Sequence, residues 1–135
     1  MKKTLVVLLA LVSVFCTLCL TACGSDADVA GTYKFQSMTM TYNGQTQTVN
    51  VGEEYGGVIL DENFNVLELK EDGTAKSSTT LDGDLVDEST GTWVKDGNNI
   101  VVTIDGESIT AKIDGDTLTM EAEEDGYSNK VVLKK

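Results

Sequence analysis

The sequence contains no proline, no histidine and no arginine, and its three cysteines all lie within the first 23 residues. Without histidine, the chain cannot form a Ser–His or Cys–His catalytic pair or a histidine-based zinc site. Neighbouring acidic residues such as Glu53 and Glu54 are common in a chain with 22 acidic residues, so they do not indicate an acid–base pair. We therefore expect a protein that is not an enzyme and that needs no cofactor and no metal.

Positive charge is also scarce, because ten lysines stand against 22 acidic residues and give a net charge of −12. A nucleic-acid backbone is bound by lysine and arginine side chains, so this balance argues against a nucleic-acid partner. The same negative charge disfavours electrostatic docking on anionic lipid headgroups. The sequence does not identify a partner protein.

The N-terminal segment has the organisation of an export signal. Lys2 and Lys3 precede a largely apolar run over residues 4–20, and small residues follow at Thr21 and Ala22, just before Cys23. A positive start, a short apolar stretch and a small-residue cleavage site are typical of secretory signal peptides. The apolar run is short for a membrane-spanning helix, which needs about 20 residues.

Leu20-Thr21-Ala22-Cys23 resembles the lipobox of bacterial lipoprotein signal peptides. The resemblance implies cleavage before Cys23 and acyl chains such as palmitate on Cys23, which would hold the protein at the extracytoplasmic face of the cell membrane. We therefore expect a signal peptide over residues 1–22, a lipidated cysteine and tether over 23–30, and one domain over 31–135. Cys16 and Cys19 would leave with the signal peptide, so the domain would fold without a disulfide.

Dipeptides typical of tight turns recur along the rest of the chain. Asn-Gly and Asp-Gly supply the positive φ angles that tight β-hairpins require. Short segments rich in Thr, Val and Ile lie between them, at the spacing of an all-β sandwich or barrel. The dipeptides begin at Asn43, Asp72, Asp82, Asp96, Asp105, Asp114 and Asp125.

Three of these turns predict a register in which one face of the sheet is apolar. Paired residues share a face, so the turns at Asp105, Asp114 and Asp125 can be checked against one another. We expect Val102 to pair with Ile109, Ala111 with Leu118, and Met120 with Val131. The predicted inward face consists of Ile100, Val102, Ile104, Ile109, Ala111, Ile113, Leu118, Met120, Ala122, Val131 and Leu133. This pattern indicates an antiparallel up-and-down meander of eight or nine strands.

Three features of the sequence before residue 98 lead to further structural predictions. The apolar phase of the first strand changes near Gln36-Ser37, which predicts a β-bulge there. Asn50 and Glu53 have the spacing of a capping box, which predicts a one- or two-turn helix over Gly52–Val58. The strand over residues 75–80 has few apolar side chains, so it is either an edge strand or the wall of a cavity.

Gly31-Thr32-Tyr33 at the start of the first strand, and Gly91-Thr92-Trp93 later, resemble the Gly-x-Trp motif with which lipocalins open. The resemblance implies a lipocalin-like β-barrel, either closed or open, with a sandwich as the other arrangement. Tyr33 replaces the usual Trp, and no arginine is available to pack across it. A lipocalin-like domain also implies a small hydrophobic or amphipathic ligand.

Two functions fit this reading. In the first, the barrel binds a small apolar or amphipathic ligand. Large or adaptable side chains would line the site, namely Tyr33, Phe35, Met38, Met40, Leu67 and Trp93. The alternative is that these side chains simply form the hydrophobic core. In the second, the domain is a structural or protein-interaction module of the cell envelope with no small-molecule site. The acidic residues Asp82, Asp84, Asp87 and Glu88 could offer oxygen ligands to calcium, but their spacing fits no EF-hand and favours a solvated loop.

Overall fold

A computed structural model describes residues 28–135, and these residues form an all-β domain. No helix long and apolar enough to cross a membrane is found among them. The predicted signal peptide, Cys23 and most of the tether lie outside the described residues. The strands are β1 (Gly31–Tyr42), β2 (Gln45–Asn50), β3 (Glu54–Tyr55), β4 (Val58–Ile59), β5 (Asn65–Leu69), β6 (Thr74–Leu81), β7 (Asp84–Asp96), β8 (Asn99–Ile104), β9 (Glu107–Asp114), β10 (Thr117–Glu124) and β11 (Tyr127–Lys134).

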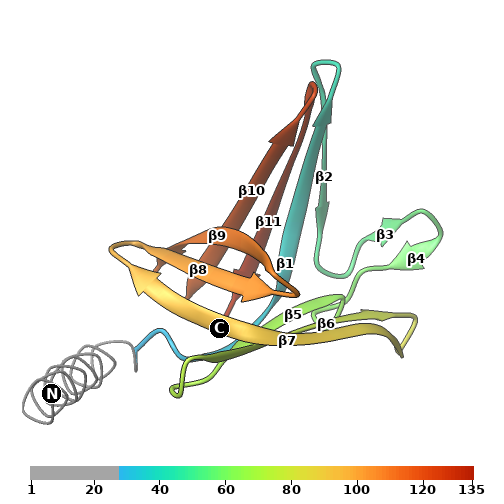
Figure 1. Cartoon of the computed structure of the whole chain (residues 1–135). Helices are drawn as coiled ribbons and strands as arrows, with labels where there is room; N and C mark the ends of the chain where they lie inside the picture. Colours follow the sequence, from blue (N-terminus) through green and yellow to red (C-terminus); the bar gives the residue numbers. More distant parts are fainter. Residues whose placement is uncertain (1–27) are drawn as a thin grey trace, which may run out of the picture.

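The main sheet is an antiparallel meander that closes on itself (Figure 1). Strands β5 to β11 follow one another in order, β1 pairs with β5 on one side, and β1 pairs with β11 on the other. These eight strands form the barrel, while β2 pairs with the second half of β1 as a ninth strand. The predicted all-β meander of eight or nine antiparallel strands is confirmed.

One end of the barrel is packed solid, and we call it the closed end. At this end β1 begins at Gly31, β5 ends at Leu69 and β6 begins at Thr74, and the adjoining inward side chains are excluded from solvent. Burying each large apolar side chain contributes roughly 1.5–3 kcal/mol, so the core stabilises the fold mainly from this end. The fully buried side chains are Tyr33, Phe35, Leu69, Ile100, Leu118 and Leu133.

The predicted register is confirmed at two of the three hairpins and wrong at the third. Val102 pairs with Ile109, and Met120 pairs with Val131, as expected. In the hairpin between β9 and β10, however, Asp114 pairs with Thr117, so Ala111 faces Met120 and not Leu118. Asp114 stays in the strand because Gly115 supplies the positive φ angle of +59°. The two-residue shift keeps the same side chains inward, because strand faces alternate with a period of two.

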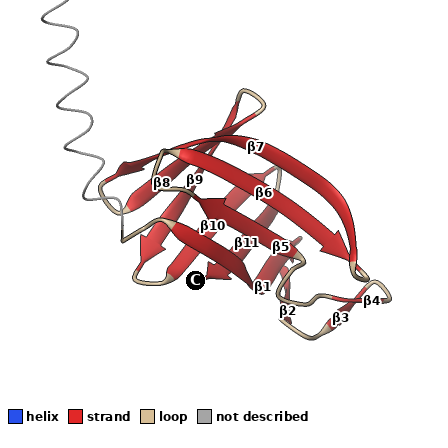
Figure 2. Ribbon diagram, turned by 90° about the horizontal axis from the view of Figure 1, so that it is seen from below, coloured by secondary structure: helices blue, strands red, loops and turns tan. Residues whose placement is uncertain are grey.

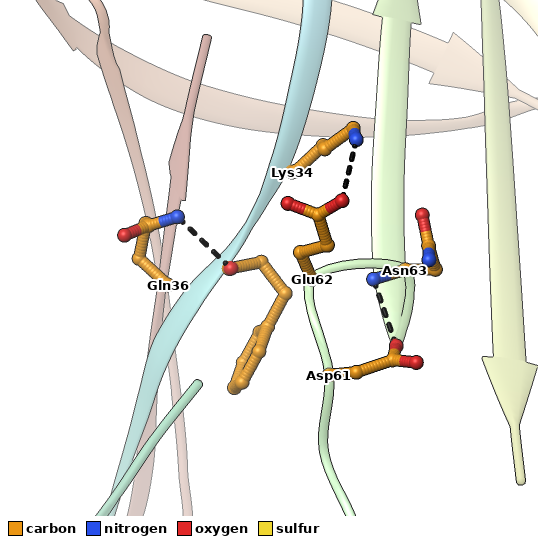
Figure 3. Close-up of polar contacts among 6 residues, drawn as sticks. Lys34, Gln36, Asp61, Glu62 and Asn63 are labelled. Carbon is orange, nitrogen blue, oxygen red and sulfur yellow. Dashed lines mark hydrogen bonds and ion pairs between the residues drawn. The ribbon is translucent and has the colours of Figure 1, made fainter. Parts of the chain in front are cut away.

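The predicted bulge is present in β1. The register with β11 shifts between Phe35 and Ser37, and the Gln36 amide donates a hydrogen bond to the Phe35 carbonyl at 3.1 Å (Figure 3). The segment before β5 binds β1 at the same place. The Lys34 ammonium lies 2.8 Å from a Glu62 carboxylate oxygen, and the Phe35 N–H donates to the Glu62 carbonyl at 3.1 Å. The bulge therefore marks the point where β1 leaves β5 and takes β2 as its neighbour.

The helix predicted over Gly52–Val58 is wrong, because β3 and β4 form a short hairpin there. Half of the capping box does form: the Asn50 N–H donates to the Glu53 carboxylate at 2.7 Å. The chain then reverses at Gly56-Gly57, where both residues have positive φ angles of +61° and +86°. A right-handed helix cannot continue through two such residues.

The opposite end of the barrel is splayed, and we call it the open end. Strands β9 and β10 pair only between Ala111–Asp114 and Thr117–Met120, although both strands run further. Likewise β1 and β5 pair only over Gly31–Lys34 of β1. Beyond these limits the barrel divides into a ribbon of β2, β1, β11 and β10 and a second layer of β5 to β9 (Figures 1 and 2). Strand β6 lies inside the second layer between β5 and β7, so it is not an edge strand.

Candidate functional site

A cavity of about 130 Å³ lies inside the barrel, next to the place where β9 and β10 separate. Most of its wall is apolar, and Asn65 and Ser77 add two polar groups on the side of β5 and β6. The apolar lining residues are Leu67, Val102, Ile104, Ile109, Ala111 and Met120. The side chains of both layers therefore meet around this space.

Ile109 shows how the cavity reaches solvent. Its side chain points inward, because it pairs with the buried Val102 across β8 and β9. Even so, Ile109 is 51% exposed, because β10 does not pair with this part of β9. An inward apolar residue with high exposure marks a lateral opening between β9 and β10.

The size of the cavity limits what it can hold. Cavities of about 150 Å³ lined by Leu, Ile and Phe bind benzene, whereas complete ligand pockets usually measure about 300–1,000 Å³. At about 130 Å³, this cavity has room for one small apolar group. The remainder of a larger ligand would extend through the lateral opening.

A second concave surface lies on the ribbon beyond the barrel. It is an open groove of about 610 Å³, lined by Met40, Tyr42, Gln45, Thr46, Gln47, Tyr55 and Tyr127. The turns at Asn43-Gly44 and Asp125-Gly126 lie beside each other at its end, because Tyr42 pairs with Tyr127 (Figure 1).

The six residues expected to line a ligand site all belong to the core or pack against it, but they do not line one cavity. Leu67 lies in the cavity wall, and Met40 lies in the groove on the ribbon. Met38 is partly buried and packs against the core. Tyr33, Phe35 and Trp93 belong to the buried core, with exposures of 0%, 0% and 4%. Within the described residues, the structure therefore does not bring these six side chains together around one space.

The closed end holds a small network around Tyr33. Its hydroxyl donates to the Val29 carbonyl at 2.5 Å, and the Lys135 ammonium lies 5.7 Å from the centre of its ring. Lysine thus lies over the aromatic ring in a chain that has no arginine. Burial, and to a lesser extent the negative charge of Asp116, raise the pKa of Tyr33. Trp93 is fixed nearby, since its indole N–H donates to the Lys70 carbonyl at 2.8 Å.

Of the eight residues that line the cavity, only Leu67 was among the six expected site residues, and both polar lining residues, Asn65 and Ser77, were missed. The weakly apolar strand over 75–80 was the available signal, since Ser77 is one of its small inward groups. Asn65 carries no comparable signal in the sequence. Its place in the wall follows from the pairing of β5 with β6, where it faces Thr79.

The acidic residues near position 85 do not form a compact loop. Asp84, Asp87 and Glu88 lie along β7, and Glu88 forms an ion pair with Lys76 at 3.3 Å. No group of three or more acidic side chains suited to holding a metal ion is found between residues 28 and 135.

The topology defines the class of the domain as a closed, eight-stranded, antiparallel up-and-down β-barrel. No known protein family matches the chain by sequence, and no curated protein matches it. Among solved structures, the chain is similar to a lipocalin-like protein from Bacteroides uniformis. The two are 16% identical with a TM-score of 0.49, and the similarity covers 81% of this chain and 99% of the other.

Proposed function

We propose that this protein is a membrane-anchored lipoprotein on the extracytoplasmic face of the cell, and that its barrel binds a small amphipathic ligand. The observation that supports ligand binding best is the cavity with its lateral opening between β9 and β10. The apolar end of the ligand would occupy the cavity, and its polar end would remain at the opening.

The lining of the cavity suits the apolar end of such a ligand. Its wall is formed mainly by aliphatic side chains, and transfer of apolar surface from water contributes about 25 cal/mol per Å². The Asn65 amide and the Ser77 hydroxyl lie among them and can each donate and accept a hydrogen bond. The short apolar chain of an amphipathic ligand matches the aliphatic part of this wall.

The lipid anchor is supported by Leu20-Thr21-Ala22-Cys23 and the signal-like segment before it. After loss of the signal peptide with Lys2 and Lys3, the mature chain would contain eight lysines and 22 acidic residues, which gives a net charge of −14. A surface of that charge is not attracted to anionic lipids, so the acyl chains on Cys23 would provide the attachment. Each buried CH₂ group contributes about 0.8 kcal/mol, and two acyl chains suffice for stable anchoring.

Intact-mass measurement of the protein from bacterial membranes tests the anchor. The expected mass is that of a chain starting at Cys23 with a diacylglyceryl group attached. The Cys23→Ala variant should remain as unprocessed precursor. A mature chain that begins elsewhere and carries no lipid would refute this part of the proposal.

Calorimetric titration with 1-octanol, a neutral amphipathic probe, tests the ligand site. Ser77→Phe places a ring in the cavity, whereas Ser78→Phe places the same ring on the opposite face of β6. We expect Ser77→Phe to weaken binding at least tenfold and Ser78→Phe to leave it unchanged, with both variants folded by circular dichroism. If the unmodified domain binds no octanol, or if both variants bind equally, the domain is better explained as an envelope module without a small-molecule site.

A further inference from the structure

The groove on the ribbon gathers three of the four tyrosines of the chain. Tyr42, Tyr55 and Tyr127 come from β1, β3 and β11, and they are 62%, 40% and 39% exposed. The fourth, Tyr33, is completely buried in the core. Aromatic rings are normally buried because they are large apolar groups, so three exposed rings in one groove indicate a binding surface.

Glutamine amides lie beside these rings. Gln45 pairs with Tyr42 and Gln47 with Met40 across β1 and β2, so all four side chains share the inward face of the ribbon. An amide offers two donors and one acceptor oxygen, which suits a ligand that both donates and accepts hydrogen bonds. In the part of the chain that the structure describes, neither glutamine side chain makes a hydrogen bond.

The residues that line the groove are uncharged, although the protein is strongly acidic and Glu124 is paired with Tyr127 across β10 and β11. No charged side chain is among its lining residues, and none occurs over residues 35–52, the longest uncharged stretch after Cys23. A cationic ligand would favour a carboxylate in the lining, and an anionic ligand would require a lysine. The lining therefore matches an uncharged ligand with polar groups.

We propose that this groove is a binding site for a neutral saccharide chain. The apolar C–H faces of sugar rings would stack on Tyr42, Tyr55 and Tyr127, because an aromatic ring offers a flat apolar face and a polar edge. The sugar hydroxyls would exchange hydrogen bonds with Gln45 and Gln47. This site lies beyond the cavity of the barrel and shares no lining residue with it.

The position of the groove suits an extended ligand. It is open to solvent, and one wall is β2, which is the edge strand of the main sheet and leaves its outer side unpaired. A chain of several sugar units could lie across the rings and continue past both ends of the groove. A small compact ligand would contact fewer of the three tyrosines.

The test uses a panel of immobilised oligosaccharides, both neutral and anionic, followed by titration of the strongest neutral one. Tyr42→Ala removes one stacking ring, and Gln47→Ala removes one amide while leaving the rings intact. Thr39→Ala is the matched control, because Thr39 lies beside Met40 but points to the opposite face, where its hydroxyl is bonded to Thr48, and neither threonine lines the groove. Choline and a proline-rich peptide are included as probes for a cation and for a peptide ligand.

We expect binding of neutral oligosaccharides with a Kd that is the same in 50 and 500 mM salt. Tyr42→Ala should weaken it at least tenfold and Gln47→Ala about threefold, while Thr39→Ala and Ser77→Phe should have no effect. If Tyr42→Ala does not fold, saccharide binding by Gln47→Ala alone tests the proposal. The proposal is overturned if no neutral saccharide binds, if only an anionic saccharide, choline or the peptide binds, or if neither groove variant weakens binding. Tyr42→Ala is expected to leave octanol binding unchanged, so the proposals for the cavity and for the groove are tested independently.

Discussion

Leu133 tests the closure of the barrel, because its side chain lies where the last strand meets the first. It pairs with Phe35 of β1 on one side and with Leu118 of β10 on the other, and it is completely buried. Leu133→Ala would remove three carbon atoms from a site surrounded by packed side chains. Substitutions of this kind cost about 3–4 kcal/mol, because the lost transfer free energy and the cavity left behind add together.

Urea denaturation followed by circular dichroism measures this loss. With a slope of about 1.5 kcal/mol per molar urea, the midpoint should fall by about 2 M. A domain of this size has about 5–15 kcal/mol of stability, so the variant should still fold without urea. Val132→Ala is the control, because Val132 lies on the opposite, partly exposed face and should cost about 1 kcal/mol or less. Equal losses for the two variants would show that the faces of β11 are assigned wrongly.

Three further predictions follow from the packing. Gly91→Ala should destabilise the domain by about 1–3 kcal/mol in the same denaturation assay, because a Cβ there would lie 2.0 Å from the Thr103 carbonyl oxygen; unchanged stability would contradict the close β7–β8 approach. Val102→Asp should unfold the domain by circular dichroism, whereas Thr103→Asp on the outer face should be tolerated. Burial raises the pKa of Tyr33, so its folded state holds the hydroxyl proton more tightly and stability should fall as pH rises above about 10. Tyr33→Phe should flatten that fall in alkaline thermal melts, and a slope that persists unchanged would refute it.

Much of the fold could be predicted from the sequence because its signals are local. Each Asp-Gly turn fixes two neighbouring strands, and the alternation of apolar residues fixes which face is inward. The same locality explains the error at Asp114, where either Asp114-Gly115 or Gly115-Asp116 could form the loop. Both choices place Ala111 and Leu118 on the inward face, so the pattern alone cannot separate them.

The cavity could not be located from the sequence because it depends on where pairing stops. Ile109 was correctly placed on the inward side of the meander, but no local pattern shows that β9 and β10 separate after Ala111 and Met120. The predicted helix failed for a related reason. The Asn50–Glu53 contact does form, yet the two glycines that follow favour a reversal of the chain.

The central claim is that a ligand enters the barrel between β9 and β10 and places its apolar end against Leu67 and Met120. Titration of the ¹⁵N- and methyl-labelled domain with 1-octanol, followed by NMR, tests it most directly. We expect the largest shifts at Leu67, Ile109 and Met120, with little change at Leu69 and Leu133 near the closed end. Shifts that are absent, or that are concentrated at the closed end, would contradict the account.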